Sequence, residues 1–259
     1  MKNNKTKVGG VALFNGILFS SNYRQAIVQH NGDKINCRTS EYVKCKDVLS
    51  KIPILRGILG VSSQVGNATP EFVTSSGEKP DSKINTVLIY MLEIIAIIGI
   101  PMLCSLIVPQ AYRSLVQAIV IILEFIIYLL AAKYTKELEK VFMYHGAEHK
   151  TIFCFEHGKE LTVDNIREEK RFHPRCGTSF LLIVLVVSIL VSSVVTWDNV
   201  LMRVGMKILL LPVTVGISYE IIKFAGRHDN WLTRIISAPG MWLQRLTVFE
   251  PTDDMIECA

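Results

Sequence analysis

The sequence contains no glycine-rich phosphate loop, no dinucleotide-binding fingerprint and no basic-aromatic motif of the kind that binds nucleic acid. A nucleotide-dependent or nucleic-acid-binding function is therefore not expected. Its six cysteines show no framework spacing, which excludes a disulfide scaffold and favours reduced thiols. The net charge of +5 is better explained by contact with a membrane surface.

Long apolar runs are absent from residues 1–86, which are polar and basic, and abundant between residues 87 and 224. Half of all residues are hydrophobic and the mean hydropathy is +0.34, which favours a membrane protein. The apolar patch at residues 9–21 is too short and too glycine-rich for a span. No small-residue cleavage site follows it, so a signal peptide is not expected either.

Four stretches are long and apolar enough for helices that cross about 30 Å of hydrocarbon: residues 87–108, 114–132, 179–196 and 201–224. The last carries Arg203 and Lys207 near its start, and these side chains are expected to reach the interface. We therefore predict a mainly α fold, an integral membrane bundle of about four transmembrane helices with a small cytoplasmic α+β portion.

Lysine and arginine are concentrated in three parts of the chain. Residues 1–86 hold 12 of the 28, residues 133–178 hold 9 and residues 223–259 hold 4, against one in residues 109–113 and two in residues 198–207. Basic residues accumulate on the cytoplasmic side of a membrane. Both termini and the central loop are therefore predicted to be cytoplasmic in a multi-pass protein of the cell membrane.

The predicted organisation has five parts. They are a cytoplasmic N-terminal segment (1–86), a transmembrane hairpin (87–132), a cytoplasmic loop with the candidate site (133–178), a second transmembrane hairpin (179–224) and a cytoplasmic tail (225–259). The tail contains Trp242 and Arg245, a pair typical of an interfacial helix.

Three soluble elements are predicted outside the spans. Alternating residues around Asn31-Gly32-Asp33 predict a β-hairpin within residues 20–50. Residues 49–65 resemble an amphipathic helix lying on the membrane, with Lys51 and Arg56 towards lipid phosphates. Residues 160–170 predict a short strand followed by a helix capped by Thr162 or Asp164.

The richest chemistry lies in the loop after the second span. Residues 134–154 predict a helix that extends this span and carries His145, Glu148 and His149. Imidazoles four residues apart face the same side of a helix and suit one divalent ion. The arrangement H-x-x-E-H is that of inverzincins, in which the histidines bind zinc and the glutamate acts as a general base. Two histidines on a solvated helix are the alternative.

A second cluster, FHPRCGTS, returns the chain to the membrane where the third span begins. His173 and Cys176 are both good zinc ligands, and Pro174 and Gly177 are expected to restrain the turn. One of the two would complete three ligands and leave a position open, the catalytic pattern. Both together with His145 and His149 would close a structural site.

Other polar residues are weaker candidates. Cys154, Glu156 and His157 lie near the predicted site and are expected to support it rather than bind the metal. Glu93 and Glu124 lie inside predicted spans, where a carboxylate either pairs across the bundle or lines a transport pathway.

The segments YHGAEHKTIFCFEHGKELTVDNIR and FHPRCGTSFLL closely resemble the bacterial YqhQ family of uncharacterised membrane proteins, often labelled predicted metal-dependent enzymes. The resemblance extends to ILRG after Pro53, to SYE from Ser218 and to PGMWLQRLTVFEPTDDMIECA at the end of the chain. It implies a metal-linked role for His145, Glu148, His149, His173 and Cys176, without naming a substrate.

The N-terminus departs from the family pattern. The family usually begins with a motif like GGQAV-x-EGVMM, whereas this chain has Val11 in place of glutamine and Asn15 in place of glutamate. A glutamate that binds metal or acts as an acid would imply an altered or lost activity here, the alternative that we favour. If the glutamate only holds the N-terminal segment, Asn15 could replace it by hydrogen bonding.

Three functions agree with these patterns. The first is a zinc-dependent hydrolase in which Glu148 activates water for attack on a peptide or lipid at the cytoplasmic face. The second is a channel or transporter with Glu93, Glu124 and Glu220 along its pathway, which with so few spans needs to be a homo-oligomer. The third is a membrane assembly factor whose zinc is structural.

Overall fold

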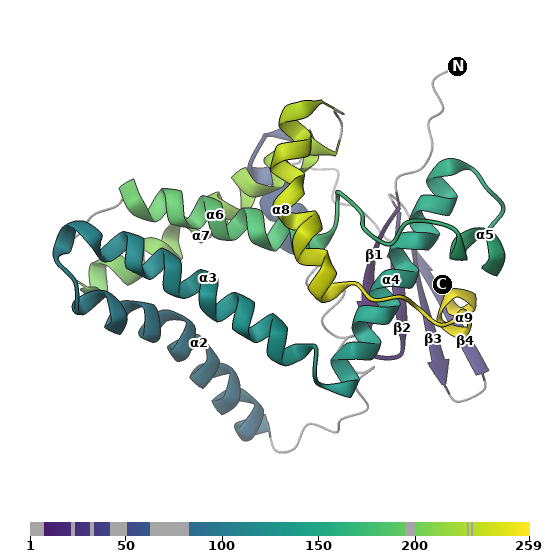
Figure 1. The fold of residues 1–259 in the computed structure, drawn as a ribbon, viewed down its shortest axis with the longest axis horizontal. Helices are drawn as coiled ribbons and strands as arrows, with labels where there is room; N and C mark the ends of the chain where they lie inside the picture. Colours follow the sequence, from purple (N-terminus) through teal and green to yellow (C-terminus); the bar gives the residue numbers. More distant parts are fainter. Residues whose placement is uncertain are drawn as a thin grey trace.

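A computed structural model describes residues 8–21, 24–31, 34–41, 51–62, 83–194, 200–226, 228 and 230–259. Figure 1 shows a mainly helical chain with one small antiparallel sheet. This confirms the predicted mainly α class with a small α+β portion.

The sheet is a meander of four strands in the order β1-β2-β3-β4. The strands are β1 (Gly9–Leu13), β2 (Gly16–Ser20), β3 (Arg24–Asn31) and β4 (Lys34–Glu41). The predicted hairpin is the β3–β4 pair, in which Asn31 lies opposite Lys34. The β1–β2 hairpin was missed, although an Asn-Gly pair between two apolar runs is a hairpin signal.

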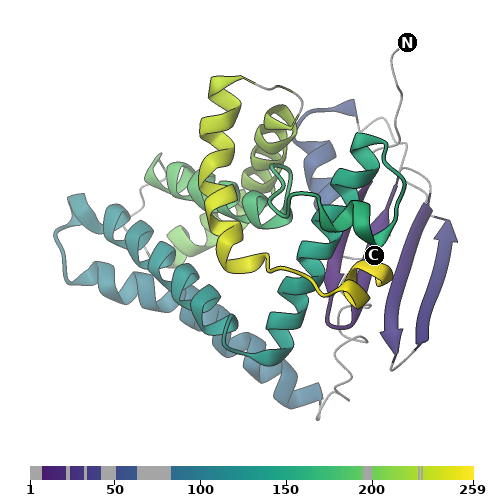
Figure 2. The same cartoon turned by 45° about the vertical axis from the view of Figure 1, so that its right-hand side comes forward.

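The sheet packs on helix α4 (Lys136–His157), as Figure 2 shows. Their shared core joins Ala12 and Ile17 of the sheet to Val141, Tyr144 and Ala147 of the helix. Burial of these apolar side chains is the main force that holds the sheet on the helix.

Four long apolar helices form the other side of the molecule: α2 (Lys83–Leu106), α3 (Arg113–Ala132), α6 (Gly177–Val194) and α7 (Val200–Ala225). A short 3₁₀ helix, η2 (Gln110–Tyr112), joins α2 to α3. Two helical segments, Arg113–Ala132 and Gly205–Ala225, are long and apolar enough to cross a membrane. Ile95–Leu106 and Gly177–Val191 are shorter apolar segments, so two of the four predicted spans meet the full length within the described residues.

The predicted helix over residues 134–154 does not continue the second span. Helix α3 ends at Ala132 and α4 begins at Lys136, with a turn between them. Thr135 has an extended backbone, and its hydroxyl donates to the Ala132 carbonyl. The break turns α4 away from α3 and against the sheet.

Three shorter helices follow α4 in the chain: α5 (Val163–Arg167), α8 (Trp231–Thr247) and α9 (Asp253–Cys258). Thr162 caps α5, because its hydroxyl accepts from the Asn165 amide at 3.3 Å. The strand predicted before α5 does not form, since residues 159–162 have no regular structure.

The predicted helix at residues 49–65 is observed over residues 55–62, and its predicted ends at 49–50 and 63–65 lie outside the described residues. Arg56 was expected to face lipid phosphates, and that expectation is wrong. Its guanidinium donates to both carboxylate oxygens of Glu220 on α7. The short helix that carries Arg56 packs closely on α7, since a Cβ at Gly57 would lie 2.8 Å from Tyr219. This packing brings Arg56 to Glu220.

Candidate metal centre

Helix α4 presents two histidines on one face. His145 and His149 are four residues apart, and their ring centroids are 4.4 Å apart. His149 is buried, and burial lowers its pKa, although the nearby Cys176 thiol opposes this shift. A neutral imidazole is the form that binds a metal ion.

Cys176 reaches the histidines from the start of α6. Its Sγ lies 3.1 Å from His145 Nε2 and is buried. The Thr178 amide donates to this sulfur at 3.4 Å, and the Thr178 hydroxyl lies 3.1 Å from it. An amide at a helix N-terminus stabilises a thiolate, which is the form of cysteine that binds metal.

Backbone carbonyls orient both histidines. The Nδ1 atom of His145 lies 3.0 Å from the Thr247 carbonyl, and that of His149 lies 2.5 Å from the Arg171 carbonyl. Because a carbonyl only accepts, each Nδ1 carries a proton, and in the neutral ring Nε2 is then the nitrogen that has the lone pair. Metal-binding histidines commonly have such a partner on the second ring nitrogen.

One donor atom from each of His145, His149 and Cys176 therefore forms a compact group, with all three atoms within 4.8 Å of one another. Two imidazole nitrogens and one thiol sulfur fit zinc, which accepts both ligand types. The group is a candidate metal site with three protein ligands.

The C-terminal segment positions the Thr247 carbonyl by crossing α4 at Gly146. The Phe249 amide donates to the Phe142 carbonyl at 2.9 Å. A Cβ at Gly146 would lie 2.0 Å from the Phe249 carbonyl oxygen, so this crossing requires glycine. The glycine within H-G-A-E-H is thus explained by the path of the C-terminal segment.

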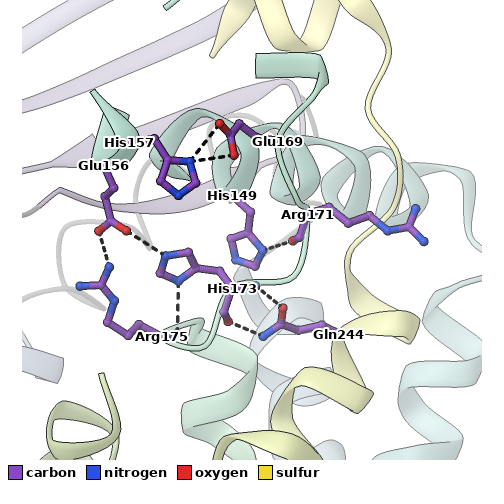
Figure 3. Close-up of polar contacts among 8 residues, drawn as sticks. All are labelled: His149, Glu156, His157, Glu169, Arg171, His173, Arg175 and Gln244. Carbon is purple, nitrogen blue, oxygen red and sulfur yellow. Dashed lines mark hydrogen bonds and ion pairs between the residues drawn. The ribbon is translucent and has the colours of Figure 1, made fainter. Parts of the chain in front are cut away.

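Gln244 of α8 holds the turn that carries His173. Its side chain accepts from the His173 amide at 2.8 Å and donates to the His173 carbonyl at 2.7 Å (Figure 3). It also donates to the Ser179 hydroxyl at 3.0 Å. Since this side chain is fully buried, each of these bonds replaces a lost contact with water.

His173 lies beside the three-donor group rather than in it. Its ring centroid is 5.6 Å from that of His149. The Arg175 amide donates to His173 Nδ1 at 3.2 Å, so Nε2 carries the proton. This Nε2 points towards Glu156 and lies 3.6 Å from its Oε2 (Figure 3). In this arrangement His173 offers no lone pair to a metal.

The weaker candidates form ion pairs and hydrogen bonds around the site. His173 and Arg175 lower the pKa of Glu156 to about 2. His157 lies 3.0 Å from Glu169, and the Cys154 thiol donates to the Glu160 carbonyl at 3.4 Å. None of these contacts is to His145, His149 or Cys176, so the supporting role of these residues stays a prediction.

Glu148 lies between α4 and β1. A Cβ at Gly10 would lie 2.7 Å from its Cδ, so the strand can pack here only because residue 10 is glycine. Burial raises the pKa of Glu148 to about 7, while the charge of nearby His145 opposes the shift. A buried carboxyl group beside a metal site is a candidate proton carrier near neutral pH.

The two residues that depart from the family pattern, Val11 and Asn15, lie away from the Glu148 carboxyl group in different places. Alternate residues of a strand face opposite sides. Gly10 and Ala12 face α4, so Val11 faces the other side with Leu13. Asn15 lies in the β1–β2 turn, where its backbone carbonyl accepts from the His30 amide at 2.7 Å, while its side-chain Oδ1 is buried without a hydrogen-bond partner among the described residues.

Sequence reasoning located the histidines, Glu148 and Cys176 but missed the groups that orient them. No pattern pointed to Gln244 or to the carbonyls of Arg171 and Thr247. Backbone carbonyls have no sequence signature, because every residue has one. The glycines at positions 10 and 146 were the available signals of close approach.

Residues 52–259 match the family model described as a protein of unknown function (DUF1385). The chain belongs to this family. It is also similar to the uncharacterized protein YqhQ of Bacillus subtilis (strain 168), with 31% identity over 97% of this chain and 89% of that protein. No solved structure matches the chain.

Proposed function

We propose that this chain is a membrane protein with a zinc site at the cytoplasmic face of the bilayer, acting as a metal-dependent hydrolase. The single observation that carries the proposal is the group of His145, His149 and Cys176, in which both histidines have their second nitrogen bound to a carbonyl. Three ligands with a fourth position open are typical of catalytic rather than structural zinc.

Exposed apolar side chains support the membrane location. Helices α2, α3, α6 and α7 all expose large hydrophobic residues, including Leu103, Leu123, Leu190 and Leu209. Soluble monomers rarely expose apolar patches beyond a few hundred Å². Together with the two helices of spanning length, this favours burial of the four-helix side in lipid. The distribution of lysine and arginine favours cytoplasmic termini.

The residues of the site divide the chemistry between them. His145, His149 and Cys176 would hold the ion, which when bound supplies Lewis-acid chemistry and makes water a stronger nucleophile near neutral pH. Glu148 holds or releases a proton at its carboxylate oxygens, which the sheet and α4 shield from bulk water. The substrate is a peptide or lipid that reaches the site at the membrane surface.

The first test is zinc content of the detergent-purified protein, measured by elemental analysis. We expect about one zinc per chain, and loss of it in His149→Ala and in Cys176→Ser. The matched control is His157→Ala, which removes an exposed imidazole on the same helix. A wild-type protein without metal would overturn the proposal.

His173→Ala separates the catalytic pattern from the structural one. With three ligands, this variant retains zinc; with His173 as the fourth ligand, it loses zinc like His149→Ala. Glu148→Gln is then the test of hydrolysis, because we expect zinc to remain while turnover of a candidate substrate is lost. A Glu148→Gln variant that keeps full turnover would remove the glutamate from the mechanism.

A transport function is the second candidate, because polar groups lie among the apolar helices. Both carboxylate oxygens of Glu124 are buried without a hydrogen-bond partner among the described residues. Seven residues earlier, on the same face of α3, Gln117 accepts from Lys207 at 3.2 Å and donates to Ser105 at 2.9 Å. Loss of ion flux in Glu124→Gln with intact zinc, in a homo-oligomer, would favour this candidate.

A further inference from the structure

Helix α8 has three distinct faces. At 100° per residue, Gly240, Gln244 and Thr247 lie on one face, which is buried against the rest of the protein. Trp231, Ile235 and Trp242 lie on a second, exposed face, with the two tryptophans 73% and 57% exposed. The third face carries the only charged residues of the helix, Arg234 and Arg245.

The exposed apolar face lies where a membrane surface is expected. Helix α8 contacts α6, α7 and α3. Figure 1 shows it running across the ends of α6 and α7 rather than along them. An amphipathic helix with tryptophan on its apolar face and arginine at the edge is typical of the bilayer interface.

The arginine face lines a cleft of about 1240 Å³. Helix α8 contributes Arg234, Met241, Trp242 and Arg245 to one wall. The rest of the lining comes from the end of α4, from residues 168–170 and 172–175, and from Ala225, Gly226 and His228. Because Trp242 belongs to both the apolar face and the cleft wall, the cleft opens beside the surface assigned to lipid.

The charges of the two walls differ. Helix α8 contains no acidic residue. Three carboxylates line the other side: Glu156 pairs with Arg175, Glu169 lies 3.0 Å from Lys159, and the exposed Glu168 lies close enough to Lys159 to raise its pKa. The carboxylates of that wall are thus partly neutralised, while Arg245 is exposed on the wall without acids. The cleft combines a cationic edge with an apolar exit, which complements an anionic amphiphile.

The cleft ends next to the metal centre. His173 and Arg175 line it, and the ring centroids of His173 and His149 are 5.6 Å apart. Cys176 follows Arg175 directly in the chain. A headgroup in the cleft would therefore lie beside the three-donor group.

We infer that this cleft binds the phosphate headgroup of an anionic glycerophospholipid from the bilayer, with its acyl chains along the Trp231–Trp242 face of α8. The inference rests on the proposed function and narrows its substrate class to lipid. Arg245 and Arg234 contact the phosphate region, and Trp242 contacts the upper acyl chains.

The test uses the full chain with Trp197→Phe and Trp231→Phe, so that Trp242 is the only tryptophan and is excited selectively over the tyrosines. The protein is reconstituted in phosphatidylcholine vesicles that contain a small share of lipid brominated on its acyl chains, either phosphatidylglycerol or phosphatidylcholine. We expect brominated phosphatidylglycerol to quench Trp242 more strongly. Arg245→Gln should weaken the preference about fivefold, and Arg234→Gln with Arg245→Gln about thirtyfold, at about 1 kcal/mol per arginine.

Two controls decide between the outcomes. Lys133→Gln removes an exposed cation outside the cleft and should leave the preference unchanged, because a general surface charge would respond to it equally. Water-soluble glycerol phosphate should not displace the lipid. Displacement would show that the cleft binds soluble phosphate esters and would overturn the assignment to a membrane lipid. Equal quenching by both lipids would overturn the inference.

Zinc content measured on the same samples separates the two proposals. If the wild-type protein shows the lipid preference but is purified without zinc, the lipid site is supported and the hydrolase is contradicted. A protein that binds zinc but shows no preference keeps the metal centre and loses the lipid site.

Discussion

The two sides of the molecule follow opposite rules for polar and apolar groups. Around α4, several charged and polar side chains are buried and many of them are paired: Lys150, for example, donates to the Arg167 carbonyl at 2.8 Å and lies 2.5 Å from Glu250. On α2, α3, α6 and α7, large aliphatic side chains are exposed along the helices. Under the proposed membrane location, the difference reflects two solvents, water around α4 and hydrocarbon around the four helices.

The largest effect is expected where the C-terminal segment crosses α4. Gly146→Ala places a methyl group 2.0 Å from the Phe249 carbonyl oxygen, and neither backbone can move easily. We expect a loss of about 3 kcal/mol in the free energy of unfolding, together with weaker zinc binding because the Thr247 carbonyl shifts. Thermal unfolding in detergent measures the first effect.

The control for this variant is Gly205→Ala on α7, where an added Cβ meets nothing within 4 Å. It should be neutral or slightly stabilising, since alanine favours a helix over glycine. Equal destabilisation by both variants would contradict the close crossing.

A lysine on the apolar side tests the contrast between the two solvents directly. Leu123 on α3 is 52% exposed and Leu161 near α5 is 53% exposed. In hydrocarbon, Leu123→Lys should cost about 3 kcal/mol of insertion free energy, whereas Leu161→Lys should change stability by less than about 0.5 kcal/mol.

The membrane-inserted fraction after carbonate extraction measures this difference. Leu161→Lys is the matched control, because the two leucines are equally exposed. If both variants stay fully inserted and equally stable, α3 does not face lipid.

Gln244→Ala tests the buried hydrogen bonds of the α4 side. It leaves the His173 amide and carbonyl unsatisfied in a buried turn, which should cost about 2 kcal/mol. Because this turn leads to Cys176, zinc affinity should also fall about tenfold or more. Competition with a zinc-binding dye measures the affinity, and Arg245→Ala, an exposed neighbour, should leave it unchanged.

The smallest effect concerns pH. The pKa of Glu156 is lowered to about 2 by His173 and Arg175, so its contribution to stability is present above about pH 4.5 and is lost as the pH falls towards 2. Because the side chain is one-third exposed, we expect a loss of about 1 kcal/mol. Chemical unfolding of chelator-treated protein should show the free energy of unfolding falling over this pH range, and Glu156→Gln should reduce that dependence on pH.

Several local features were predictable because their signals are local. The spacing of His145 and His149, the Thr162 cap and the β3–β4 hairpin each depend on a few neighbouring residues. The family resemblance was confirmed over nearly the whole chain. The β1–β2 hairpin was missed because its apolar strands were considered only as a span or a signal peptide.

Other features depended on distant parts of the chain. The helix of residues 134–154 was predicted to extend the span, but the core that it shares with the sheet turns it away after Ala132. Arg56 was assigned to lipid, whereas its partner, Glu220, is 164 residues away. Ion pairs at such separations leave no periodic signal in a sequence.

The sequence by itself determined which residues are candidates for a metal site: two histidines one helical turn apart, a glutamate between them and a cysteine at the start of an apolar helix. Only the tertiary structure decided how many of them meet. By residue type, His173 and Cys176 are equally good ligands. The hydrogen bonds from the Gln244 side chain and the Arg175 amide direct His173 towards Glu156, whereas Cys176 faces His145. The physical reason is that coordination depends on where lone pairs point, and their directions are set by hydrogen bonds between segments far apart in the chain.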